Sequence, residues 1–398
     1  MKKIINLLFL LIITTSVNSQ PVVDYLLKAK AATDSGKPEF AIDLLNQAVS
    51  EIKDSRLYIE RAAANLMKGD YSAAIIDFNE ANTLAPSAGE YGLARIYAIK
   101  GDAKTSLFHL EKNMNSSFRK SEKEIMLDPA FASIENKPEW RRFWQKDWYS
   151  AIEEGIAEIE HYIILHEGDE PAALLLELKK EYPGNDELIY ADALISLSSG
   201  RNTDAVNKLT AISDRINEKY IRLMAKAQIA ASNPAGASDS YSRLIESGIA
   251  DAGLFILRAK CYLKTGEYEK ALADIEKYLV YYPSDKLALS MAGKAESVSG
   301  DNLNALKYFS ENLKLHPNDS ECYVDRADSY FISKSWDWAI KDYTMSLDLD
   351  PGNSDVWLNK GISLLNTGKT DDACHDFRKS FSMGNKRASE YISRSCIK

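Results

Sequence analysis

Apolar residues recur along this chain at intervals of three and four, and the pattern returns in segments of similar sequence. The stretch GDYSAAIIDFNEANTLAP (residues 69–86) opens with a small-residue turn, continues as one amphipathic helix and ends at a proline. Nearly the same pattern returns in GEYEKALADIEKYLVYYP from 266, GDNLNALKYFSENLKLHP from 300 and KSWDWAIKDYTMSLDLDP from 334. The sequence therefore predicts a repeated helical unit.

The spacing of these segments is constant in the C-terminal half. They begin at 266, 300, 334 and, in GKTDDACHDFRKSF, at 368, so each interval is 34 residues. A second helix is predicted before each turn, because aromatic and small residues recur there at helical spacing: Tyr58, Ala62, Phe255, Ala259, Tyr262, Leu289, Gly293, Tyr323, Ala327, Tyr330, Trp357 and Gly361. A period of this length indicates stacked helix-turn-helix units, each of which needs neighbours to bury its apolar face.

Small and large residues occupy separate positions in each predicted unit. Alanine or glycine stands where the two helices should approach most closely, at Ala62, Ala259, Gly293, Ala327 and Gly361 on the first helix and Ala74, Ala271, Ala305, Ala339 and Ala373 on the second. We expect the space left toward the next unit to be filled by Phe78, Phe309, Tyr343 and Phe377. The second helix should end where proline cannot continue the hydrogen-bond ladder, at Pro86, Pro283, Pro317 and Pro351.

These residues, in five or more copies that share one register, resemble the tetratricopeptide repeat family. Weaker copies begin near Val22, Ser87, Asp186 and Glu218, and a helical pair is predicted over 150–183. The resemblance implies an all-α fold, a helix-turn-helix solenoid in which two arrays of stacked hairpins form a right-handed superhelix with a concave inner face. It also implies a scaffold that binds other molecules.

The repeat register breaks after Asn113. The following segment carries Trp140, Phe143, Trp144 and Trp148. We expect these aromatic side chains to cover the end of the first array or to pack it against the second. We therefore place an N-terminal array with a tryptophan-rich helical tail at residues 20–149 and a C-terminal array at 150–398. The clearest repeats are 252–285, 286–319, 320–353 and 354–385, and a capping helix is predicted over 386–397.

The first residues, MKKIINLLFLLIITTSVNSQ, combine a basic start, an apolar run and a small-residue tail. This pattern predicts a secretory signal peptide over residues 1–19, with Val17 and Ser19 at the cleavage-specifying positions. The apolar run is shorter than the roughly 20 residues of a spanning helix, which disfavours the alternative of an uncleaved anchor. No cysteine near the cut could accept a lipid, so we expect an exported protein that is periplasmic or secreted, with no transmembrane segment after cleavage.

Charge and cysteine content restrict the classes of partner and the role of disulfides. The formal net charge is −9 and becomes more negative without Lys2 and Lys3, so no nucleic-acid partner is expected. The four cysteines are too few for a disulfide scaffold in 398 residues, but an exported chain permits bridges. Cys374 and Cys396 fall in the last repeat and its tail, a chain ending that also resembles exported bacterial members of the family. They are the pair to test, and both a bridge and free thiols stay open.

Candidate chemistry is sparse. The densest titratable patch, HYIILHEGDE, places His161 and His166 five residues apart, off the three- or four-residue spacing that aligns two ligands on a helix face. A solvated helix end explains it better than a metal site. The sequence has no GxSxG, no phosphate-cradling glycine loop and no CxxC. We therefore predict a protein that is not an enzyme and holds no cofactor or metal.

The resemblance implies that the binding face is lined by first helices. Carried onto this chain, it gives Arg56, Ile59, Ala63, Leu66 and Met67 in the first array. In the second it gives Ile256, Lys260, Leu263, Lys264, Ser290, Lys294, Val324, Asp328, Phe331, Ile332, Leu358 and Ile362. The lysines among aliphatic residues suit a peptide with some acidic residues, and the alternative is that several aliphatics complete the core. The Lys and Asn clamp by which some members grip terminal carboxylates is not recognisable.

The leading hypothesis is a non-enzymatic exported adaptor that holds a peptide or partner protein in the groove. One rival is a small-ligand or carbohydrate binder, or an enzyme, with a pocket at the junction of the arrays near Trp140 to Trp148. A second rival is a self-assembling structural envelope protein. The sequence leaves the partner, the pathway and the oligomeric state open.

Overall fold

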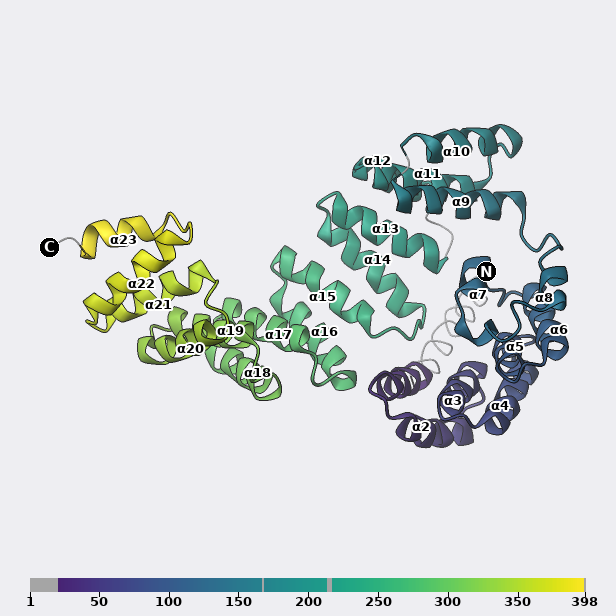
Figure 1. Ribbon diagram of the computed structural model, residues 1–398, viewed down its shortest axis with the longest axis horizontal. Coiled ribbons are helices and arrows are strands. Elements are labelled where there is room, and N and C mark those ends of the chain that lie inside the picture. Colours follow the sequence, from purple (N-terminus) through teal and green to yellow (C-terminus); the bar gives the residue numbers. More distant parts are fainter. Residues whose placement is uncertain (1–20, 167, 213–216, 397–398) are drawn as a thin grey trace, which may run out of the picture. The chain divides into compact units, whose positions relative to one another are not determined.

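The computed structural model describes residues 21–166, 168–212 and 217–396 (Figure 1). The predicted signal peptide, residues 1–19, lies outside these described residues. The chain divides into two compact units, one up to Ala252 and one from Gly253 onward, and each is described by itself. All regular secondary structure in the described part is helical, which confirms the predicted all-α fold.

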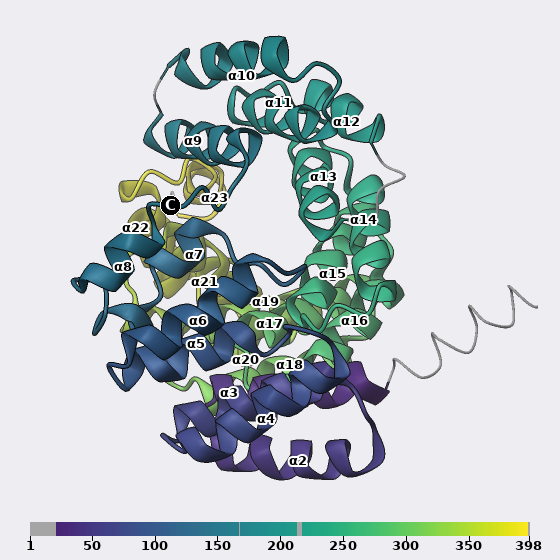
Figure 2. The ribbon, with the colours of Figure 1, turned by 90° about the vertical axis from the view of Figure 1, so that its right-hand side faces the viewer.

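The first unit begins with a helix that includes residues 21–34. It continues with α2 (Pro38–Glu51), α3 (Ser55–Met67), α4 (Tyr71–Leu84), α5 (Glu90–Ile99), α6 (Ala103–Met114), α7 (Glu122–Met126), the 3-10 turn η1 (Pro129–Phe131), α8 (Pro138–Phe143), α9 (Ala151–Leu165), α10 (Glu170–Glu181), α11 (Asp186–Ser198), α12 (Asn202–Thr210), α13 (Glu218–Ala230) and α14 (Pro234–Glu246). Both views show α2 to α6 as neighbouring antiparallel helices (Figures 1 and 2). The weaker predicted copies and the pair over 150–183 are therefore helical.

The second unit consists of four hairpins and one further helix. Its helices are α15 (Gly253–Thr265), α16 (Tyr268–Tyr281), α17 (Lys286–Ser299), α18 (Asn302–Leu315), α19 (Ser320–Ile332), α20 (Trp336–Leu349), α21 (Ser354–Asn366), α22 (Thr370–Ser382) and α23 (Ala388–Ser395). Each hairpin packs on the next, α16 on α17, α18 on α19 and α20 on α21. The capping helix is shorter than the predicted 386–397, since it begins at Ala388.

The boundary predicted near residue 149 lies inside the first unit. The tryptophan-rich segment packs on the helices before it, where Trp140 and Phe143 are buried against Leu110, Met114 and Phe131. The helices after it, α9 to α13, bury a separate core around Ile159 and Leu188. The register break is thus a change of core within one unit, while the units separate between Ala252 and Gly253.

The small residues of the repeat lie where the pattern predicts. All eight of the predicted alanines on first and second helices, from Ala62 to Ala373, are fully buried. The two glycines have a more specific cause: a Cβ on Gly293 would lie 2.4 Å from the ring of Phe309, and one on Gly361 would lie 2.7 Å from the ring of Phe377. These two rings fill space over the first helix of their own hairpin. Phe377 also stacks on Tyr391 of α23, the element that follows it, as expected for this position. Phe78 does reach the next hairpin, where its ring lies against Gly92.

Buried ion pairs connect the two helices of several hairpins. An arginine on the first helix pairs with an aspartate sixteen positions later on the second: Arg61 with Asp77 at 2.5 Å, Arg258 with Asp274 at 2.7 Å and Arg326 with Asp342 at 2.7 Å. The aspartates are at most 6% exposed, and each receives a two-pronged guanidinium contact. Such forks compensate the cost of burying a carboxylate.

The last hairpin carries a weaker version of this pair. Lys360 replaces the arginine, and its Nζ lies 3.3 Å from Asp376 Oδ2. Burial raises the pKa of Asp376 although Lys360 opposes the shift. A lysine offers a single compact charge where arginine offers a planar fork, so the buried carboxylate is less well compensated here.

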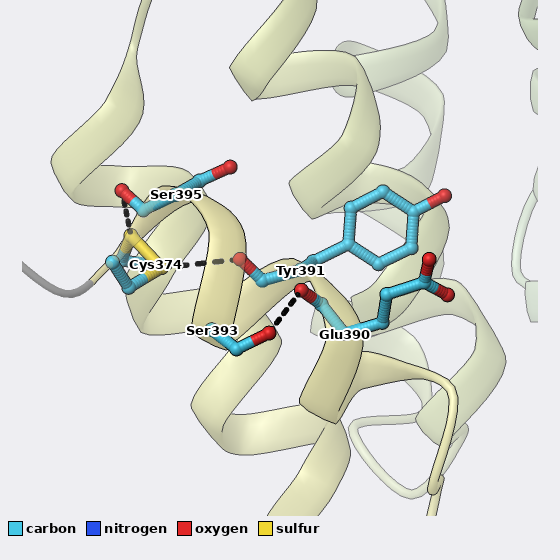
Figure 3. The surroundings of a disulfide bond; sticks show 6 residues. Cys374, Glu390, Tyr391, Ser393 and Ser395 are labelled. Carbon is cyan, nitrogen blue, oxygen red and sulfur yellow. Dashed lines mark hydrogen bonds between the residues drawn. A yellow bond between two sulfur atoms is a disulfide. The ribbon is translucent and has the colours of Figure 1, made fainter.

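A disulfide fastens the last helix to the last hairpin. Cys374 on α22 is bonded to Cys396, just after α23, with an S–S distance of 2.00 Å (Figure 3). This is the pair singled out from the sequence. Helix α23 also packs Ala388, Tyr391 and Ile392 against the cluster around Phe377. The tail therefore covers the final apolar face of the second unit.

Candidate functional site

The residues predicted to line a groove differ widely in exposure. Six are exposed, namely Arg56, Met67, Lys260, Lys264, Lys294 and Ile332. Nine are half-buried, namely Ile59, Ala63, Leu66, Ile256, Leu263, Val324, Asp328, Phe331 and Ile362, and two, Ser290 and Leu358, are buried. Most of the half-buried aliphatic and aromatic side chains pack against core clusters, so the alternative that several of them complete the core holds.

Leu358 and Asp328 are corrections to the predicted groove. Leu358 is fully buried in a cluster that includes Ile340 of the preceding hairpin, so its position belongs to the core between repeats. Asp328 accepts a 2.6 Å hydrogen bond from the hydroxyl of Tyr343, and burial raises the pKa of the Asp328 carboxyl. Its carboxylate is therefore committed to an internal contact.

The three lysines of the second unit lie on first helices. Lys260 and Lys264 are four residues apart on α15, which places both on one exposed face. Lys294 on α17 is exposed but pairs with Asp325 at 2.8 Å, and Asp325 also accepts a hydrogen bond from the buried hydroxyl of Ser290. Within the part of the chain that the structure describes, α15 thus offers the freer pair of charges.

A hollow in the first unit brings two of the predicted residues together with a segment that the prediction missed. Ile59 and Ala63 of α3 form one wall, and the other residues are Phe78, Ala88, Tyr91, Gly92, Arg95, Asn113, Ser117, Phe118, Arg119, Lys120 and Glu124. Its volume is about 410 Å³, which lies in the range of protein clefts that hold small ligands or side chains. Arg56, Leu66 and Met67 are not part of this lining.

The floor of the hollow is rigid. The ring of Phe78 lies directly against Gly92 on α5, where any Cβ would collide with it at 2.1 Å. The segment of residues 117–120 is fixed from below by Asn113, which is fully buried and bonds the carbonyl of Phe118 at 2.9 Å and the amide of Lys120 at 3.2 Å. These contacts position the Phe78 ring and residues 117–120 in the lining.

Asp128 organises the polar side of the hollow. It accepts a 2.8 Å hydrogen bond from the hydroxyl of Tyr91, and Arg95 Nε lies 2.7 Å away. Burial and the neighbouring Asp128 raise the pKa of Tyr91. Arg95 is incompletely used, because its buried Nε is close to Asp128 but is not aligned to donate a hydrogen bond to any described residue.

A second hollow, in the second unit, is polar. It has a volume of about 460 Å³ and is lined by Lys286, Asn318, Asp319, Ser320, Glu321, Val324, Ser346, Asp350 and Asn353. Lys286 is paired with Asp319 at 2.6 Å, and this pairing raises the pKa of Lys286. Val324 is the one predicted groove residue in this lining.

The tryptophan-rich segment packs onto itself. Trp140 lies edge-to-face with Trp144, Phe143 stacks on Trp148 at 4.5 Å, and the indole N–H of Trp148 donates to the carbonyl of Phe143. These contacts fit the expected role of closing the first series of repeats. At the histidine patch, His166 ends α9 in a left-handed conformation, and no group of three metal-ligating side chains is found among the described residues.

Two family models described as tetratricopeptide repeat match residues 222–286 and 343–375. The "Protein SGT1 homolog" of Bos taurus is 30% identical over 89 residues, which is 22% of this chain, and the chain spans about a quarter (26%) of the length of that relative.

Three similar solved structures are tetratricopeptide repeat proteins. One from Parabacteroides merdae has 20% identity, covers 62% of this chain and 99% of its own, and gives a TM-score of 0.45. The C-terminal part of another, from Cytophaga hutchinsonii, has 13% identity, coverage of 59% and 98%, and a TM-score of 0.49. YrrB, described as having an unusual peptide-binding site, has 18% identity, coverage of 47% and 97%, and a TM-score of 0.39. Among the described residues, no helix has the length and apolar character needed to cross a membrane.

Proposed function

Because this chain is a tetratricopeptide-repeat protein, we propose that it is a non-enzymatic scaffold that binds a peptide segment of a partner protein on its first helices. The observation that carries this proposal is the hollow of the first unit. Its lining includes residues of the first helices α3 and α5, the Phe78 ring is closely packed against Gly92, and apolar side chains stand together with an arginine whose donors are underused. An extended peptide can place one side chain in such a hollow and continue along the neighbouring helices.

The second unit supports the same role by a different surface. Lys260 and Lys264 present two charges on the first helix α15, and exposed Ile332 adds apolar area on α19. We propose that this face binds acidic residues of the partner. Buried alanines, and in several hairpins a buried ion pair, fill the space between the two helices and leave the outward positions of the first helices for binding.

We further propose that the protein acts after export, in the periplasm or outside the cell, on the strength of residues 1–19 and of the Cys374–Cys396 bridge, which an oxidising compartment permits. Affinity capture from envelope extracts, with residues 20–398 as bait, tests scaffold and location together. We expect selective retention of a partner protein, and N-terminal sequencing of the native chain from the same fraction should begin at Gln20. A bait that retains nothing above a denatured control would contradict the scaffold, and a native chain that starts at Met1 would contradict export.

A further inference from the structure

We propose that the hollow between α3, α5 and residues 117–124 binds an acidic side chain of the partner segment, with an apolar side chain beside it, and that Arg95 is its anchor. This inference rests on the proposed function and names the chemistry that the first unit selects. The occupant is an internal stretch of polypeptide in which Glu or Asp follows or precedes Leu, Ile or Phe.

The charged side chains that line the hollow are mostly cations. Four charged side chains line the hollow, and three of them, Arg95, Arg119 and Lys120, are cations, although the chain as a whole has a net charge of −9. Arg119 is held by Glu153 and by the carbonyl of Trp148, and Lys120 pairs with Glu124 at 2.9 Å. Arg95 is the cation with donors to spare.

Among these cations, Arg95 has guanidinium donors that can bind a carboxylate. An arginine has five N–H donors in a planar fork. Here the Nε is buried and close to Asp128, yet no aligned hydrogen bond from it to a described residue exists. The Nε is taken by the ion pair with Asp128 at 2.7 Å, and the side chain is 33% exposed, so the outer guanidinium nitrogens can reach a ligand. A carboxylate placed in the hollow would satisfy the guanidinium with a charge-assisted pair.

The lining of the hollow also contains apolar side chains. Ile59, Ala63, Ala88 and the ring of Phe78 belong to the same lining as Arg95, and Phe118 in this lining is 42% exposed. An apolar side chain bound here would remove this surface from water. Neighbouring residues of an extended strand point in different directions, so an acidic residue can contact Arg95 while the residue beside it contacts the apolar part of the lining.

The test uses an array of hexapeptides, acetylated at one end and amidated at the other, in which one Glu or Asp stands next to Leu, Ile or Phe. Matched peptides carry Gln or Asn instead, and a third set has a free C-terminal carboxylate. Fluorescently labelled residues 20–398 are applied, and hits are titrated by anisotropy. We expect the acidic peptides to bind at least about tenfold more tightly than their amide counterparts, which is the range of a charged hydrogen bond.

Variants of the chain assign the effect to the hollow. Arg95→Gln should abolish the preference for acidic peptides, Arg95→Lys should keep part of it, and Arg141→Gln, an exposed arginine on α8, should leave it unchanged. Ala63→Leu fills the hollow from α3 and should weaken all peptides. The melting temperature of each variant is measured. If Arg95→Gln unfolds, Arg95→Lys and Ala63→Leu are compared instead: the assignment requires that Arg95→Lys reduces the preference for acidic peptides and that Ala63→Leu weakens all peptides.

Each result has a definite meaning. Equal binding of acidic and amide peptides, a preference that survives Arg95→Gln, or the absence of binding at millimolar peptide would overturn the assignment. Binding confined to the free C-terminal acids would show a site for chain ends and would also overturn it. A bait that captures an envelope protein equally well with Arg95→Gln leaves the scaffold intact and rejects only the acidic occupant, whereas failure of both capture and peptides removes both proposals.

Discussion

Replacing Arg326 with alanine is expected to lower the free energy of unfolding of the second unit by about 3 kcal/mol, because it leaves a buried carboxylate without its partner. Asp342 is 2% exposed, and the Arg326 guanidinium contacts both of its carboxylate oxygens. The same fork raises the pKa of Arg326. Hydrogen exchange measured by mass spectrometry should show faster exchange in α19 and α20, where the pair connects the two helices.

Two further variants separate the ion pair from the loss of a surface charge. Arg378→Ala removes an exposed arginine on α22 and should change stability little. The double variant Arg326→Met with Asp342→Leu should recover more than half of the loss, since a buried pair can be replaced by apolar residues of similar volume at small cost. If Arg326→Ala costs no more than Arg378→Ala, the pair does not hold the hairpin together.

Removing the disulfide is expected to lower the stability of the last hairpin by about 3 kcal/mol, the loop-closure value for a bridge of this span. The sequence separation of Cys374 and Cys396 is 22 residues, and the loop contains the whole of α23. The change to make is Cys396→Ser, because Cys396 is half-buried whereas Cys374 lies in the core. Thermal unfolding and hydrogen exchange over α22 and α23 measure the effect.

Reducing agent provides the control for this prediction. It should lower the stability of the unmodified chain by a similar amount and should have no further effect on Cys396→Ser. The other two cysteines, Cys261 and Cys322, are buried, and burial raises the pKa of Cys322 to about 11, so thiol exchange from that position is slow. Four reactive thiols in the chain unfolded without reductant would show that no bridge forms.

The helices and the repeat register were predictable because they depend on periodic sequence. Positions such as Ala339 and Gly361 recur at a fixed interval, and close helix contacts admit only small side chains at those places. The capping tail was predictable for the same reason, since a final repeat leaves an apolar face that something must cover. The contact that each aromatic ring makes was not predictable. Phe78 and Phe309 occupy the same register position, yet Phe78 faces Gly92 of the next hairpin and Phe309 faces Gly293 of its own hairpin.

The ion pairs were available in the sequence and were missed. Arg61, Arg258 and Arg326 stand at one register position, and their aspartates follow at a constant distance. A comparison of polar positions between copies is enough to show them. The repeat from 286 has Ala292 and Tyr308 at the corresponding places, so this feature is specific to certain hairpins.

The hollow could be predicted only in part. Ile59 and Ala63 follow from the repeat register, but Arg95, Phe118 and Lys120 enter through a segment that departs from it. That segment is positioned by the hydrogen bonds of Asn113 and by the pairing of Arg95 with Asp128, which join residues far apart in sequence. Local periodicity does not predict such contacts, and for the same reason it did not predict the burial of Leu358.

The most direct test of the scaffold role is to measure the affinity of the captured partner for two charge-reversed chains. One carries Lys260→Glu, Lys264→Glu and Lys294→Glu on first helices, and its matched control carries Lys307→Glu, Lys314→Glu and Lys379→Glu on the exposed faces of second helices. We predict that the first variant stays folded and binds at least about tenfold more weakly than the unmodified chain, and that the control binds as before. Equal affinity for both variants, or a loss confined to the second-helix control, would contradict binding on the first helices.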